Sequence, residues 1–68
     1  MTVQVNGEAT EVDDGATVTV LLERLDLPGR GRGVAVAVDA EVVPRGEWDR
    51  TRLAPGARVE VVQAIQGG

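Results

Sequence analysis

The residues of this chain that are best suited to chemistry are its last two, Gly67 and Gly68. A terminal glycine presents a carboxylate with no side chain beside it, so it can enter a narrow active site and adopt backbone angles closed to other residues. A frayed end could look the same, but Arg58–Ile65 has the pattern of a strand that runs directly into these glycines. We therefore interpret residues 65–68 as a flexible functional tail and residues 1–64 as the domain that presents it.

The rest of the chain lacks the usual catalytic side chains. It contains no histidine, cysteine, lysine or tyrosine, so the common general bases and strong nucleophiles are missing and a self-contained enzyme is not expected. Disulfides and metal sites built from cysteine or histidine are excluded as well. Because all seven basic residues are arginines, no side-chain amine is available to capture an activated C-terminus.

Length and composition indicate one small domain. The chain has 68 residues, 43% of them apolar, and Trp48 is its single aromatic residue, so aliphatic side chains must fill the core. A net charge of -4 argues against a nucleic-acid partner, because nucleic-acid-binding domains are normally basic. There is no apolar run of membrane-spanning length and no signal-peptide pattern, so we expect a soluble cytoplasmic protein without a membrane partner.

The first half of the chain predicts a hairpin and a helix. Alternating apolar residues indicate strands over residues 1–6 and 8–12, and Asn6-Gly7 between them is typical of a tight hairpin turn. Thr17 is a suitable helix N-cap, and Pro28-Gly29 should stop the helix. The helix has one apolar stripe made of Val18, Leu21, Leu22 and Leu25.

The second half predicts short strands separated by turns. Gly29–Gly33 has the glycine content of a phosphate-binding loop, but it follows a helix and precedes a strand, so we interpret it as a solvated connection. We expect a strand at Val34–Val38, near the middle of a sheet or under the helix, then a turn at Asp39-Ala40 and a short strand at Glu41–Val43 that Pro44 ends. A helical or irregular turn over Arg45–Leu53 should place Trp48 at the edge of the core. A type II turn at Ala54-Pro55-Gly56 then precedes the last strand at Arg58–Ile65.

One face of the last strand becomes apolar as it approaches the tail. Val59 and Val61 point to one side and predict the buried face. On the other side, charged residues give way to Val62 and Ala64, which are candidates for partner docking if this face meets solvent. Exposed valines are also common without any role, so docking and ordinary exposure both remain open here.

The order of elements predicts an α+β domain in which one main helix packs on a mixed sheet. If the first and last strands lie side by side and parallel, they need a long crossover, and the helix supplies it. This arrangement is the ubiquitin-like β-grasp fold.

Several segments of the chain form a recognisable set: Gly15, Thr17, Val18, Leu21, Leu22, Glu23 and Leu25, then Val36-Ala37-Val38, Val43-Pro44-Arg45 with Trp48, and Gly67-Gly68. Together they resemble the ThiS family, the ubiquitin-like sulfur carriers of thiazole formation in thiamine biosynthesis. The resemblance covers nearly the whole chain, and its most specific part is Val-Pro-Arg-x-x-Trp. A Gly/Arg-rich loop at 29–33 and a polar Glu60 on the last strand depart from the family pattern.

The resemblance implies a carrier that other proteins act on. A ThiF-type adenylyltransferase would use ATP and magnesium to activate the carboxylate of Gly68, at the end of a tail that includes Gln66 and Gly67. A persulfide from a sulfur-donor protein would then convert it to a thiocarboxylate, which thiazole synthase would receive. The carrier itself is expected to bind no cofactor and no metal.

Three other functions share some of these features. The small subunit of molybdopterin synthase is a sulfur carrier that also ends in Gly-Gly, and ubiquitin-like protein modifiers use such a tail to form isopeptide bonds. A non-covalent interaction module with an inert tail is the third. Chain length and the Val-Pro-Arg-x-x-Trp segment favour the carrier of thiazole formation.

Overall fold

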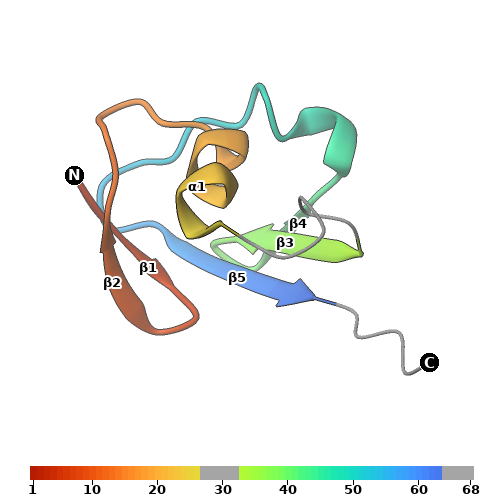
Figure 1. Ribbon diagram of the computed structural model, residues 1–68, viewed down its shortest axis with the longest axis horizontal. Helices are drawn as coiled ribbons and strands as arrows, with labels where there is room; N and C mark the ends of the chain where they lie inside the picture. Colours follow the sequence, from red (N-terminus) through yellow and green to blue (C-terminus); the bar gives the residue numbers. More distant parts are fainter. Residues whose placement is uncertain (27–32, 64–68) are drawn as a thin grey trace.

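The computed structural model describes residues 1–26 and 33–63. One helix packs on a single mixed sheet of five strands, as predicted (Figure 1). No helix in these residues is long and apolar enough to cross a membrane. The elements are β1 (Thr2–Val5), β2 (Glu8–Glu11), α1 (Val18–Leu25), β3 (Val34–Val38), β4 (Glu41–Val43), the 3-10 turn η2 (Arg45–Glu47) and β5 (Arg58–Gln63).

The last strand lies in the middle of the sheet. The strand order is β2-β1-β5-β3-β4, and β1 and β5 are parallel while every other pair is antiparallel. The β1–β5 register places Gln4 opposite Arg58 and Val5 opposite Val59. The prediction that the first and last strands are parallel neighbours is confirmed, and α1 lies on the crossover that this pairing requires.

The N-terminal hairpin turns where the sequence predicts it. Asn6 and Gly7 both have positive φ, 50° and 86°, which a tight turn of this kind needs and which asparagine and glycine tolerate best. The turn sends the chain from β1 back into β2, away from β5.

Helix α1 begins at the predicted cap. The Thr17 hydroxyl caps its N-terminus by accepting the Val20 N–H at 3.3 Å. The helix ends at Leu25, where Asp26 adopts the left-handed conformation with φ 52° and donates its N–H to the Glu23 carbonyl. Pro28-Gly29, the predicted stop signal, lies outside the described residues.

The core lies between α1 and one face of the sheet. Its most deeply buried side chains come from β1, α1, β3 and β5, which are the elements that the sequence pattern brings together: Val3, Val18, Leu21, Val36 and Val59. Trp48 closes one edge of this core, as predicted. It is 7% exposed, its Nε1–H donates to the Val43 carbonyl at 3.0 Å, and the Arg45 guanidinium lies 5.1 Å from its ring centre.

Two turns in the second half of the chain differ in how well their residues suit them. Gly56 has φ 78°, and the Ala57 N–H donates to the Ala54 carbonyl at 3.0 Å, which confirms the type II turn. Asp39 and Ala40, between β3 and β4, also have positive φ, 49° and 72°. This conformation is unfavourable for alanine, because its Cβ crowds the following carbonyl oxygen.

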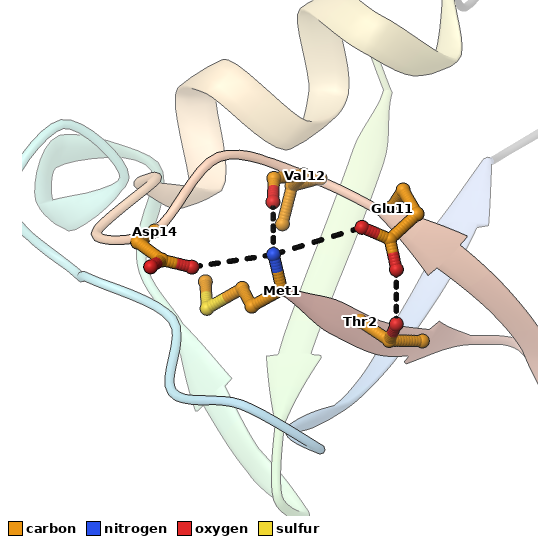
Figure 2. A network of polar contacts seen from close by, with 5 residues as sticks. All are labelled: Met1, Thr2, Glu11, Val12 and Asp14. Atoms are coloured by element: carbon orange, nitrogen blue, oxygen red, sulfur yellow. Dashed lines mark hydrogen bonds and ion pairs between the residues drawn. The ribbon is translucent and has the colours of Figure 1, made fainter.

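Acidic groups surround the N-terminal amine (Figure 2). The Met1 amine donates to the Val12 carbonyl at 2.7 Å and lies 3.2 Å from a carboxylate oxygen of Asp14 and 3.7 Å from one of Glu11. The hydrogen bond and charge of Asp14, helped by the charge of Glu11, raise the pKa of the amine above its ordinary value of 8.0. The Thr2 hydroxyl, which donates to Glu11, and the amine together lower the pKa of Glu11 below its ordinary 4.5.

Replacing Ala40 by glycine should stabilise the protein. Glycine removes the Cβ crowding at φ 72°, and this gain exceeds the entropy that glycine adds to the unfolded chain, so we expect Ala40→Gly to raise the free energy of unfolding by about 0.5–1 kcal/mol. Urea unfolding followed by Trp48 fluorescence measures the change. The control is Ala9→Gly on exposed, extended β2, which should lower the free energy of unfolding by a similar amount. If both variants lose the same free energy of unfolding, Ala40 is not strained in the wild type.

The amine network predicts how stability depends on pH. Because folding raises the pKa of the Met1 amine, its contribution is complete below pH 8.0 and is lost as the pH rises through the folded pKa. Because folding lowers the pKa of Glu11, its contribution is present above pH 4.5 and is lost on acidification through the folded pKa. We expect Asp14→Asn to reduce the alkaline loss of stability in urea unfolding, whereas the charge-matched control Asp13→Asn keeps it. If the free energy of unfolding falls equally with rising alkaline pH in wild type and Asp14→Asn, Asp14 does not raise the pKa of the Met1 amine.

Candidate functional site

The predicted tail lies outside the residues that the structure describes. Gln66, Gly67 and Gly68 belong to it, and so does Ala64, so the division into a domain and a tail stays a prediction. The structure does describe the strand that precedes the tail in the sequence, because β5 is described up to Gln63.

Strand β5 is held on both of its sides. Along β3 it pairs from Val59, opposite Val38, to Gln63, opposite Val34. On the other side, β1 pairs with its first half only, because the chain turns away at Asn6. Strand β5, which precedes Gly68 in the sequence, therefore lies in the centre of the sheet (Figure 1).

The Asn6 side chain continues the pairing where β1 stops. Its Oδ1 accepts the Val61 N–H at 2.9 Å, and its Nδ2 donates to the Val61 carbonyl at 3.1 Å. Sequence reasoning missed this role, since Asn6-Gly7 already had a sufficient explanation as a turn. The contact joins residues 55 positions apart, and nothing local in the sequence signals it.

The sheet face opposite α1 carries an apolar area on β5, β3 and β4. Directly paired residues share a face, and the register pairs Ala35 with Val62 and Ala37 with Val42. Val62 is 63% exposed and Val42 76% exposed, whereas Val59 is buried on the α1 side. The predicted orientation of the β5 side chains is confirmed. We call Ala35, Ala37, Val42 and Val62 the outer patch.

The other half of the same face is polar. Thr2 and Gln4 of β1 lie opposite Glu11 and Ala9 of β2, and Gln4 also lies opposite Arg58. The outer face is thus divided along β5, with hydrogen-bonding groups towards β2 and aliphatic groups towards β4.

A separate open cleft of about 410 Å³ lies between the β3–β4 hairpin and η2. Three carboxylates line it, and one of them, Asp39, accepts the Arg58 N–H at 3.0 Å. Within the described part of the chain, no three acidic residues lie together as metal ligands would. The lining residues are Val38, Asp39, Glu41, Val42, Val43, Pro44, Glu47 and Thr51.

Solved structures of similar chains share this fold over their full length. The crystal structure of the thiamine biosynthesis protein ThiS from Geobacter metallireducens matches with a TM-score of 0.84 and 33% sequence identity, covering all of both chains. An NMR structure of a thiamine biosynthesis protein from the same organism matches with a TM-score of 0.79 and 33% identity, over all of this chain and 88% of the other. These matches confirm the β-grasp architecture predicted from the order of elements.

Sequence comparisons point to the same family as the solved structures. The sulfur carrier protein ThiS of Escherichia coli strain K12 is 35% identical over 68 residues, which is the whole of both chains. The family model described as the ThiS family matches residues 3–68, which include the predicted tail and both glycines. On fold and sequence together, this chain belongs to the ThiS family.

Proposed function

We propose that this chain is a sulfur carrier that supplies sulfur for thiazole formation in thiamine biosynthesis. The observation that carries the proposal is the full-length match to the Escherichia coli sulfur carrier protein ThiS. The fold supports it, because the described domain holds β5, the strand that precedes Gly67 and Gly68 in the sequence, in the centre of the sheet. The chemistry consumes ATP, and we assign it to the cytoplasm.

The carboxylate of Gly68 must be activated before it can accept sulfur. With an ordinary pKa of about 3.3–3.7 it is an anion at neutral pH and a poor electrophile. In the proposed sequence it attacks the α-phosphorus of magnesium-bound ATP on a ThiF-type adenylyltransferase, and pyrophosphate leaves. A persulfide sulfur of a donor protein then attacks the acyl carbon and AMP leaves. A thiol cleaves the resulting S–S bond, and the thiocarboxylate remains for thiazole synthase.

The carrier contributes presentation rather than catalysis. The four residues 65–68 span at most about 13–14 Å when extended, which is enough to reach into a partner's active site while the domain stays outside. Glycine at the end allows the chain to pass a narrow channel, since it has no Cβ. The absence of lysine and cysteine side chains leaves the activated acyl group with no such nucleophile on its own carrier.

We further propose that the outer patch docks the activating enzyme. Val62 lies two residues before Ala64 in the sequence, and its partner across the strands, Ala35, is also apolar and exposed. A partner that covers Val62 therefore lies close to the point where the chain leaves the sheet. Ala64, the other residue assigned to docking, would extend the same face.

The Gly68→Ala variant should lose adenylation and keep its fold. A Cβ at the reacting residue displaces the carboxylate within the channel, so we expect the rate of ATP–pyrophosphate exchange to fall about 100-fold or more. The matched control is Gly46→Ala in η2, where an added Cβ meets no atom within 4 Å and exchange should be normal. Near-normal exchange by Gly68→Ala would count strongly against the mechanism.

The Val62→Gln variant should weaken docking on the adenylyltransferase. Losing one buried valine from an interface raises the KM for the carrier by about 10-fold, while kcat and the free energy of unfolding change little. Val20→Gln is the matched control, because Val20 is also exposed, at 42%, but lies on α1. The docking proposal fails if the two variants have the same KM.

A further inference from the structure

We propose that Asn6 is a positioning residue that holds the second half of β5, the strand that precedes Gly68 in the sequence. This inference rests on the proposed function, because its consequence is measured in the loading of the carrier. It assigns Asn6 a role in partner recognition beyond its place in the hairpin turn.

The hydrogen bonds between β1 and β5 follow one series. The Gln4 N–H donates to the Ala57 carbonyl at 2.8 Å, and the Asn6 N–H donates to the Val59 carbonyl at 2.9 Å. The next groups of β5 on this side are the N–H and carbonyl of Val61. The backbone of β1 cannot reach them, since it turns away at Gly7, and the side-chain amide of Asn6 takes its place.

A primary amide side chain suits this contact well. Val61 needs one acceptor for its N–H and one donor for its carbonyl, and the primary amide of asparagine or glutamine offers both in one planar group. The short asparagine stem also tolerates φ 50° at the first position of the turn. Asn6 thus serves the turn with its backbone and β5 with its side chain, and the two uses can be separated by mutation.

The contact has a consequence for any enzyme that takes up the end of this chain. Each residue of β5 that stays in the sheet is one that the partner does not have to order on binding, and ordering a residue costs free energy. Val61 lies next to Val62 of the outer patch, so the contact also fixes the part of the patch that belongs to β5. Beyond Val59, the strand pairing of β5 is the one with β3.

The Asn6→Gly variant separates positioning from turn formation. Glycine keeps the positive φ of the turn and removes both hydrogen bonds to Val61. We expect amide exchange of Val61 to become roughly 5- to 10-fold faster relative to β3, and the KM of the adenylyltransferase for the carrier to rise by a similar factor at unchanged kcat. Asn6→Asp keeps the acceptor and loses the donor, so it should fall between wild type and Asn6→Gly in KM.

The control is Ala9→Gly, which loosens the same hairpin at an exposed position of β2 and does not touch β5. A higher KM for Asn6→Gly than for Ala9→Gly at matched stability, together with faster Val61 exchange, supports the proposal. Unchanged Val61 exchange in Asn6→Gly overturns it, and so does an equal KM in the two variants. If wild type itself is not adenylated, the proposed function fails and the KM effect with it, while the exchange of Val61 still decides whether Asn6 holds β5.

Discussion

The parallel pairing of β1 with β5 is the constraint on which the rest of the structure depends. Parallel neighbours cannot be joined by a tight turn, so the chain has to cross over, and α1 lies on that crossover and covers one face of the sheet. The pairing also brings the last strand to the centre, where β1 and β3 flank it. A central strand is the most securely held place from which a chain can leave a sheet, and this one leads to the two glycines.

The two faces of the sheet differ in burial. The α1 side buries Val3, Val36 and Val59 with the helix residues, and this aliphatic core must support a domain that has no disulfide. In the described part of the chain, the opposite face has no helix on it, and it is there that Val42 and Val62 are exposed. Substitutions on the outer face should therefore cost little stability, whereas substitutions on the inner face should cost more.

Local patterns in the sequence predicted most of the fold. Alternation gave the strands, the Thr17 cap and the leucine stripe gave the start and inner face of α1, and Asn6-Gly7 and Pro55-Gly56 gave turns that the structure confirms. The left-handed cap at Asp26 was not foreseen, because a single aspartate is a weaker signal than the Pro-Gly that follows it in the sequence. The strain at Ala40 was also not foreseen, since the residue type alone does not reveal a positive φ.

The candidate site was predictable only in part, for two different reasons. Val62 could be placed on the outer face, because period-two alternation fixes the orientation of strand residues. That Ala35 and Val42 lie beside it depends on the register of the strands, which no local pattern specifies. The Asn6–Val61 contact is equally non-local. The chemistry of Gly68 followed from residue types and from the family resemblance, and it stays a prediction.

The central claim is that the end of this chain carries sulfur, and the intact mass of the protein tests it most directly. The protein should be incubated with ATP, magnesium, the cognate adenylyltransferase and a persulfide donor, with an incubation lacking ATP as the reference. The account predicts a mass in which one terminal oxygen has been replaced by sulfur, only in the presence of ATP. An unchanged mass, or recovery of the chain joined to lysines of other proteins, would contradict it.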